Sequence, residues 1–446
     1  MDWQRDIRFK LDLVGSNGLF VGSQTSDLDV DPSRNVAYVG SFISMGVAVV
    51  DITDRANPNV VKVLSTDYVG SPNDGMNASD SADVDIKENL LAVASQPADV
   101  GGFGGVTLYD ITNPLDPELK GQFFTGGTHD VQIDPGYPSR PNIYAANFES
   151  TYDLSIIDTS NLDHPVLAAS YQTDEPQGCT NPDGYHDFGG PCNAAHDLTL
   201  LAFPNGHTIL YVAYWDSGFR LVDVTDPRHP QEIGKIDYTP GNGPALHWAE
   251  ALAGGTCCAH YVQPTPSGRY VLTEDELGVG GAGGSHIYNA TGCDGVGICN
   301  LTHLSDWNPP GRDVQASAIH ATINTNGKVE TNGVFQRFFT RDIHNLDVQE
   351  DQYLAPAYSS GVYLVDMHDK AHPFLKGFWQ GAVNVKTACH GKNTLLAYGY
   401  QGDCFFQARE VWGAKFGDSI QGSSDFYIYA SDFWDGLLVL RTISLH

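Results

Sequence analysis

The chain has 446 residues, with 24 Lys and Arg against 54 Asp and Glu, and therefore a formal net charge of −30. So acidic a chain argues against binding nucleic acid or an anionic membrane through a basic surface, and favours a small, neutral or cationic partner. It contains 41% hydrophobic residues, 48 Gly and 24 Pro, and no apolar run approaches the roughly 18 residues of a spanning helix. The sequence predicts a turn-rich globular protein, excludes a membrane protein and leaves the domain count open.

One short pattern recurs along the chain: two apolar residues and an Asp, followed seven residues later by Pro. It occurs five times, at Asp51, Asp110, Asp158, Asp223 and Asp366. Most copies follow an extended run and a turn and precede another extended run, and the Asp is interpreted as a turn former. Each unit is therefore interpreted as four short strands, which is one blade of a β-propeller.

Two further units are less regular. The 143 positions from Asp223 to Asp366 leave room for a degenerate fifth unit, with strands expected at residues 260–263 and 270–274. The last unit, residues 408–442, ends without its outer strand.

The missing strand is expected at the other end of the chain, because residues 7–15 resemble the runs that follow the Pro. Pairing of this segment with the last unit would leave no free sheet edge. We therefore expect one all-β domain over residues 1–446, a seven-bladed β-propeller closed by its N-terminal strand, with six or eight blades as the alternatives.

The recurring strand reads Val-Ala-Val-Val-Asp at residues 47–51 and Phe-Arg-Leu-Val-Asp at residues 219–223. It resembles the strand that gives the LVIVD-repeat family of extracellular β-propellers its name, and the resemblance extends over nearly the whole chain. This implies the fold but little about activity, since propellers host many chemistries.

The eight cysteines suit an oxidising compartment, and no pair has the CxxC spacing of a zinc site, so disulfides are favoured over metal. Short spacing favours Cys179 with Cys192, Cys293 with Cys299, and Cys389 with Cys404; Cys257 and Cys258 are left open between a mutual bond and separate partners.

Asparagine sequons fit the same compartment and occur at Asn77, Asn289 and Asn300. The first residues lack the apolar core of a signal peptide, so any such peptide is expected to have been removed already. The predicted location is outside the cell or in the lumen of the secretory pathway.

Histidines recur where the expected inner strands begin. Aligning those starts places six residues in one column: Ser26, Ala82, His129, His196, His260 and His344. Three interpretations stay open. The four histidines could hold one Fe, Cu or Zn ion, as in the propeller-fold carotenoid oxygenases, although here they lie on one arc. They could bond to neighbouring backbone, or act as acids and bases without metal.

The next column holds Asp27, Asp83, Asp130, Asp197, Tyr261 and Asn345, and strand alternation predicts that these side chains point away from the histidines. They are interpreted as structural ties between blades. The Glu274-Asp275-Glu276 run is interpreted as a solvated turn in preference to a Ca²⁺ site or a catalytic acid.

Aromatic residues gather in the loops and turns expected on the face where the inner strands begin. Six are predicted to form a substrate-binding wall beside the histidines: Phe148, Tyr185, Trp215, Trp248, Tyr358 and Trp434. The chain has no Ser nucleophile elbow, phosphate-binding loop or nucleotide fingerprint, so no cofactor is expected unless the histidines hold a metal.

In architecture, size, expected disulfides and sequons, the chain also resembles the fungal hetero-Diels–Alderases of tropolone-sesquiterpenoid pathways. The resemblance implies a cofactor-independent enzyme that removes water to form a quinone methide and joins it to a terpene. His129, His196, His260 and His344 are the predicted catalytic residues, acting on a hydrophobic small molecule.

Two other functions remain open. The first is a metal-dependent oxygenase or a polysaccharide lyase that uses the same histidines. The second is a non-catalytic binding propeller. In each case neither nucleic acid nor a membrane is the expected partner, and the sequence leaves the oligomeric state undetermined.

Overall fold

The computed structural model describes the chain in separate ranges: residues 7–19, 25–41, 46–65, 79–97, 104–147, 153–173, 195–214, 217–237, 259–275, 284–309, 321–323, 329–331, 343–358, 360–380, 386–388, 405–407, 411–433 and 435–445. Within these ranges the regular elements are β-strands. No helix among them is long and apolar enough to cross a membrane.

Five sheets each contain four antiparallel strands that follow one another in the chain. The first two sheets are β2 (Thr25–Asp31), β3 (Val36–Ser41), β4 (Val47–Asp51) and β5 (Asn59–Leu64), then β6 (Ser79–Lys87), β7 (Leu90–Pro97), β8 (Gly105–Asp110) and β9 (Glu118–Phe124).

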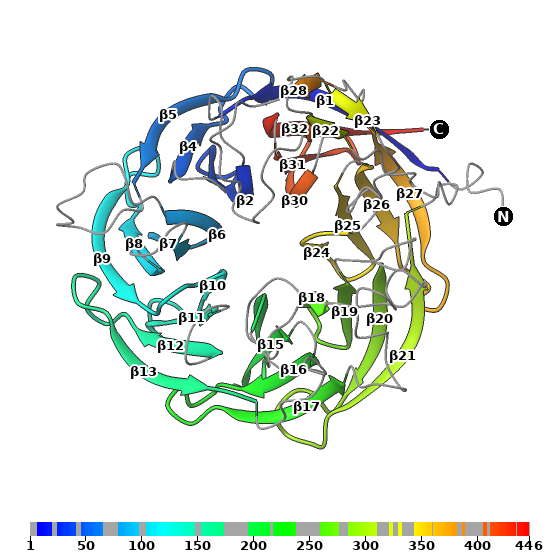
Figure 1. Cartoon of the computed structure of the whole chain (residues 1–446). Helices are drawn as coiled ribbons and strands as arrows, with labels where there is room; N and C mark the ends of the chain where they lie inside the picture. The colour runs from blue at the N-terminus through cyan, green and yellow to red at the C-terminus, as the bar shows by residue number, and fades with distance from the viewer. Residues whose placement is uncertain are drawn as a thin grey trace.

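The next three are β10 (Asp130–Ile133), β11 (Asn142–Ala146), β12 (Leu154–Asp158) and β13 (Val166–Tyr171); β14 (Leu198–Ala202), β15 (Thr208–Tyr214), β16 (Gly218–Asp223) and β17 (Gln231–Asp237); and β18 (Ala259–Pro264), β19 (Tyr270–Asp275), β20 (Ser285–Thr291) and β21 (Asn300–Trp307). All five surround a common axis, with β2, β6 and β10 close to it (Figure 1).

The remaining large sheet has eight strands in the order β24-β25-β26-β27-β1-β32-β31-β30. Its members are β24 (Asp347–Val348), β25 (Gln352–Ala357), β26 (Gly361–Asp366), β27 (Phe374–Trp379), β1 (Phe9–Asn17), β30 (Val411–Ser419), β31 (Phe426–Asp432) and β32 (Gly436–Ser444). Strand β1 pairs antiparallel with β32 from Phe9 opposite Ser444 to Asn17 opposite Leu437, and parallel with β27 at Phe9 and Lys10. The N-terminal strand thus joins two groups of strands from the last third of the chain.

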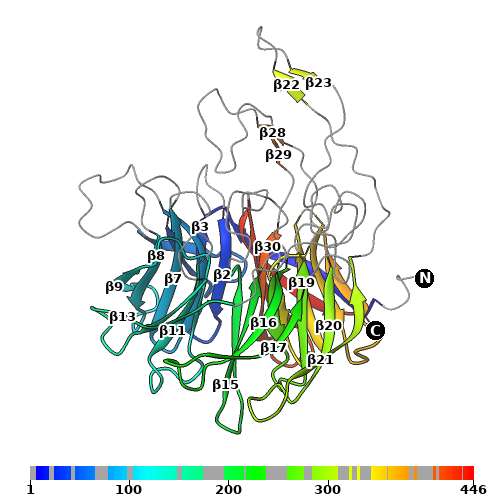
Figure 2. The same cartoon turned by 60° about the horizontal axis from the view of Figure 1, so that its bottom comes forward.

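Two short hairpins lie in the connections that lead into β24 and β30. They are β22 (Ala321–Ile323) with β23 (Val329–Thr331), and β28 (Lys386–Ala388) with β29 (Phe405–Gln407). Both stand on one side of the ring (Figure 2), the side on which the inner strands begin.

The core lies between neighbouring sheets. Every residue of β3 and of β15 is buried, because each sheet packs on both of its faces. For example, Leu28 and Val50 of the first sheet pack with Tyr429 and Val439 of β31 and β32. The sequence prediction of an all-β propeller is confirmed at this level.

The five recurring aspartates make the expected turns. Each accepts a hydrogen bond from the backbone N–H two residues later, at 2.8 to 2.9 Å: Thr53, Thr112, Ser160, Thr225 and His368. This geometry ends the third strand of each sheet and turns the chain toward the fourth.

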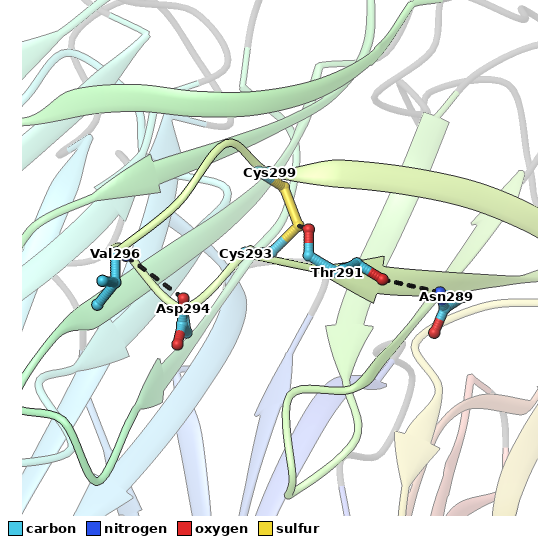
Figure 3. The surroundings of a disulfide bond; sticks show 6 residues. All are labelled: Asn289, Thr291, Cys293, Asp294, Val296 and Cys299. Carbon is cyan, nitrogen blue, oxygen red and sulfur yellow. Dashed lines mark hydrogen bonds between the residues drawn. A yellow bond between two sulfur atoms is a disulfide. The ribbon is translucent and has the colours of Figure 1, made fainter.

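One predicted disulfide falls in the described part of the chain. Cys293 and Cys299 are bonded and close the β20–β21 connection (Figure 3), so this pairing is confirmed. The other predicted pairs, which involve Cys179, Cys192, Cys257, Cys258, Cys389 and Cys404, lie outside the described residues.

Strand β1 allows a matched test of the packing, because Leu11 is 4% exposed in the core whereas Leu13 is 41% exposed. Leu11→Ala should lower the free energy of unfolding by about 2–5 kcal/mol, and Leu13→Ala by no more than about 0.5 kcal/mol. Urea denaturation followed by tryptophan fluorescence measures both. Equal effects of the two variants would contradict the packing of β1 between β27 and β32.

Candidate functional site

The four predicted histidines lie side by side where the inner strands begin. The distances between ring centroids are 4.0 Å from His129 to His196, 4.3 Å from His196 to His260, and 4.2 Å from His260 to His344. His129 is partly buried and the other three are at most 5% exposed. We call these four residues the imidazole row.

Backbone hydrogen bonds fix the row to the second strand of each sheet. His129 N–H donates to Ala146 O and His196 N–H to Ala213 O, each at 2.8 Å. His344 N–H donates to Pro356 O at the same distance. Each imidazole therefore projects from the rigid edge of a sheet.

Aromatic rings continue the row beyond His344. The Trp412 ring lies 4.1 Å from that of His344, and Phe433 stacks on Trp412 at 5.5 Å. Tyr358, which was predicted to contact substrate, is 2% exposed and lies edge-on to His344 at 5.4 Å. The other predicted contacts, Phe148, Tyr185, Trp215, Trp248 and Trp434, lie outside the described residues.

Sequence analysis missed Trp412. It precedes Gly413 on β30, as His344 precedes Asn345 before β24, and so it takes the place of the histidine in the next inner strand. Extending the aligned column to the irregular last unit would have found it.

Two carboxylates contact the two middle rings of the row, those of His196 and His260. Asp197 Oδ2 lies 2.5 Å from His196 Nδ1 and 3.7 Å from His260 Nε2. Glu274 Oε1 lies 2.5 Å from His260 Nδ1. The row thus contains two His–carboxylate pairs, and Asp197 stands between them.

The prediction that the Asp column points away from the histidines is wrong for Asp197. His196 N–H donates to Ala213 O and Ala213 N–H donates to Asp197 O, both at 2.8 Å, so two residues of one strand oppose one of the next. Such a β-bulge breaks the two-residue alternation and redirects a side chain. The pairing register also shifts around His260 and around Trp412.

The interpretation of residues 274–276 as a solvated turn is also wrong for the two residues that the structure describes. Strand β19 continues through Asp275, and the exposed fractions of Glu274 and Asp275 are 0% and 1%. Burial of both carboxyls requires polar partners, and the histidines supply them.

Burial keeps three rings of the row, His129, His260 and His344, uncharged near neutral pH. Burial lowers the pKa of His129 to about 4. Burial, followed by repulsion from the neighbouring imidazolium forms, lowers the pKa of His260 well below its usual value, and burial does the same for His344. Neutral imidazoles can accept protons, so these rings have the protonation state of general bases.

Part of the row also has the geometry of a metal site. His129, His196 and Asp197 each offer one ligand atom, and these atoms lie within 4.8 Å of one another. His260 and His344 are not members of this group. Two imidazoles and a carboxylate form a donor set that a transition-metal ion accepts.

Next to the row, aspartates tie each inner strand to the following one. Asp83 accepts from Val131 N–H at 3.3 Å, and Asp130 accepts from Leu198 N–H at 2.5 Å. This confirms the structural role predicted for these two residues.

A parallel set of ties runs two residues further along the strands. Ile86 N–H donates to Asp29 at 3.0 Å, Ile133 N–H to Asp85 at 2.6 Å, and Phe416 N–H to Asp347 at 2.6 Å. The first two bonds join one sheet to the next, and the third joins the two inner strands of the eight-stranded sheet, β24 and β30.

Partly buried Lys415 interacts with these carboxylates. Its pKa is raised well above the usual value, because Tyr261, Asp27 and Asp29 favour the ammonium form more strongly than burial opposes it. The ammonium group of Lys415 is therefore a positive charge among the carboxyl groups of the inner strands.

Comparisons with known proteins agree with the fold. Residues 144–173 and 209–238 match the LVIVD repeat; these segments contain the third strands of two sheets, β12 and β16. No curated protein matches the chain by sequence.

Two solved structures illustrate the likeness. The β-propeller domain of Cps50 (Swd1) from Myceliophteria thermophila is 11% identical with a TM-score of 0.54, over 98% of this chain and 100% of that one. Raptor from Chaetomium thermophilum is 12% identical with a TM-score of 0.56; the match covers 100% of this chain, which spans 30% of Raptor. The chain therefore has a β-propeller fold with LVIVD repeats, and likeness at this identity shows the fold alone.

The tie at Asp130 generates a pH prediction. Burial raises the pKa of Asp130 to about 7, helped by Asp197 and Asp27 and opposed by hydrogen bonds from Asp83 and Leu198. The folded protein therefore holds a proton that an unfolded Asp releases near pH 4. Between these values the folded state binds more protons, so the free energy of unfolding should fall as the pH rises from about 4 to about 7.

Asp130→Asn should flatten this dependence by more than about 1 kcal/mol across the interval, because the amide keeps an acceptor oxygen and cannot ionise. The check is urea denaturation of both proteins at pH 5 and pH 8. Asp116→Asn, at a side chain that is 70% exposed, is the control and should keep the wild-type slope. An Asp130→Asn slope equal to that of this control would refute the assignment.

Proposed function

We propose that the chain is an enzyme that transfers protons in the dehydration of a neutral, hydrophobic small molecule at the imidazole row. The observation that carries the proposal is the pair of His–carboxylate contacts, His196 with Asp197 and His260 with Glu274, each at 2.5 Å. A carboxylate at Nδ1 orients an imidazole and stabilises the imidazolium that forms when the ring takes a proton.

The two His–carboxylate pairs can act as the base and the acid that remove water from a hydroxybenzyl-type alcohol. Nε2 of His260, a neutral base, accepts the phenol proton, while the imidazolium form of His196 gives a proton to the departing hydroxyl. The C–O bond breaks, and the products are a quinone methide and water. Asp197 lies between the two rings and stabilises the imidazolium form of each; exchange with solvent returns both rings to their starting protonation states between turnovers.

The apolar side of the site supports a hydrophobic substrate. Tyr358, Trp412 and Phe433 form a contiguous set of rings beside His344. Cycloaddition of the quinone methide with a terpene, as in a hetero-Diels–Alderase, is the finer proposal. It draws on the resemblance in architecture, size, disulfides and sequons.

We further propose seven blades. The eight-stranded sheet divides into β24–β27 and a second group of four, β30, β31, β32 and β1, which would add two blades to the five separate sheets. In this arrangement residues 7–15 supply the outer strand of the last blade within a single domain.

Secretion is the proposed location. The bonded Cys293–Cys299 pair supports it, as does the exposed sequon residue Asn300. The acidic charge of the chain supports a partner other than nucleic acid or an anionic membrane.

A metal-dependent reaction is the second candidate, because His129, His196 and Asp197 bring three ligand atoms within 4.8 Å of one another. Fe, Cu or Zn bound there would supply Lewis acidity, and Fe or Cu could also supply redox chemistry. His260 and Glu274 would then remain as a base beside the ion.

The test uses o-hydroxybenzyl alcohol in water enriched in ¹⁸O. Reversible loss of water through the quinone methide exchanges the benzylic oxygen, which mass spectrometry detects. The wild-type protein should exchange it faster than buffer, and His260→Gln and His196→Gln should each slow the enzymatic exchange by about 10²–10⁴-fold, the usual contribution of general acid–base catalysis.

His229→Gln is the matched control, because His229 makes an exposed contact of 2.8 Å with Asp226 in the β16–β17 connection and is not a member of the row; it should exchange as the wild type does. Exchange equal to that of buffer, or equal in all variants, would refute the proposed enzyme. Exchange that EDTA abolishes and one metal restores would replace it with the second candidate.

A further inference from the structure

A second histidine cluster lies in the β18–β21 sheet, on the two strands farther from the axis. His286 is on β20, and His303 and Asp306 are on β21. His286 is directly opposite Asp306 in the strand register. His286 Nδ1 and His303 Nε2 each lie 2.6 Å from the same oxygen, Asp306 Oδ1.

Three potential ligand atoms thus converge on one point. One nitrogen from each histidine and one oxygen of Asp306 lie within 4.8 Å of one another. The side chains of His303 and Asp306 are 46% and 51% exposed, while that of His286 is 15% exposed. The point is open to solvent on one side and backed by protein on the other, which suits an ion that enters from solution.

A buried carboxylate contacts the second ring nitrogen of His286. His286 Nε2 lies 3.0 Å from Asp275 Oδ2, and the Asp275 side chain is 1% exposed. Metal-ligating histidines commonly bond through the second ring nitrogen to a carboxylate, which fixes the ring and makes the first nitrogen a better donor. Asp275 occupies that position, at the end of the strand that also carries Glu274.

The ring of Tyr288 restrains the second histidine. It lies edge-on to His303 at a centroid distance of 5.3 Å. Because His303 is the more exposed of the two histidines, this contact limits its rotamers and lowers the entropy lost when a ligand binds.

Charge also favours a cation at this point. Two carboxylates, Asp275 and Asp306, lie on either side of the His286 ring, at 3.0 and 2.6 Å from its two nitrogens.

We propose that His286, His303 and Asp306 form a binding site for a divalent transition-metal ion, with Zn²⁺ as the representative ligand and water at the remaining position. Two imidazoles and one carboxylate form a donor set that zinc accepts in three-ligand sites, whereas Ca²⁺ and Mg²⁺ prefer oxygen donors alone. The site is separate from the imidazole row and does not depend on the proposed enzymatic function.

The experiment is a calorimetric titration of the intact, metal-stripped protein with ZnCl₂ at pH 7.5 in a buffer that does not bind metal. Because the imidazole row also offers ligands, the decisive quantity is the difference between proteins. His303→Gln should lose one equivalent of zinc relative to wild type, or weaken that equivalent at least 30-fold. His303 is exposed, so this variant should keep the wild-type circular dichroism spectrum and melting temperature.

His372→Gln is the control. His372 makes an exposed contact with Asp369 at 2.9 Å, three residues apart as in His303 and Asp306, but the neighbouring His368 lies against Asp351, at 3.8 Å. This variant should bind zinc as the wild type does. Identical isotherms for wild type and His303→Gln, or equal losses in His303→Gln and His372→Gln, would overturn the proposal.

Asp275 is tested as a positioning residue. Asp275→Asn should weaken the same zinc equivalent by about 10–100-fold without removing it. The absorption bands of Co²⁺ bound in place of zinc should shift as well, because ring orientation alters the ligand field. Unchanged affinity and an unchanged Co²⁺ spectrum in a folded Asp275→Asn protein would remove Asp275 from the site.

Discussion

The propeller depends on carboxylates that reach from one inner strand to the backbone of the next. Asp83 and Asp130 form such ties in one layer, and Asp29, Asp85 and Asp347 form them in the next. A buried backbone N–H needs a partner, and the inner strands meet their neighbours at the axis without a shared hydrogen-bond ladder. Repelling carboxyl groups are thereby held close together, with partly buried Lys415 as the cation among them.

The same local geometry builds the candidate site. A bulge at the start of the inner strands lets two consecutive residues approach the axis, so His196 and Asp197 form a contact that regular alternation forbids. Because this strand start recurs from sheet to sheet, four imidazoles lie in one row, with ring centroids about 4 Å apart. The carboxylates that tie the inner strands together and the imidazoles of the candidate site thus come from adjacent positions of the same repeated segment.

The sequence predicted the features that repeat and missed those that depend on contacts between strands. Five Asp–Pro motifs were enough for the propeller, and column alignment found all four histidines. Trp412 was missed because the last unit departs from the motif, and Glu274 because a strand end before a Gly-rich run resembles a turn. The pairing of His286 with Asp306 depends on a register that only the folded sheet defines.

The central claim is that three rings of the row, His129, His260 and His344, are neutral imidazoles that can accept protons. Long-range ¹H–¹⁵N spectra of ¹⁵N-histidine protein measure the charge and tautomer of each ring, and His→Gln variants assign the signals. The account predicts that His129, with a pKa of about 4, stays neutral down to about pH 5, and that burial holds the pKa of His260 and of His344 well below the usual value. Titration of these three rings near pH 6.5, the ordinary value for histidine, would contradict it.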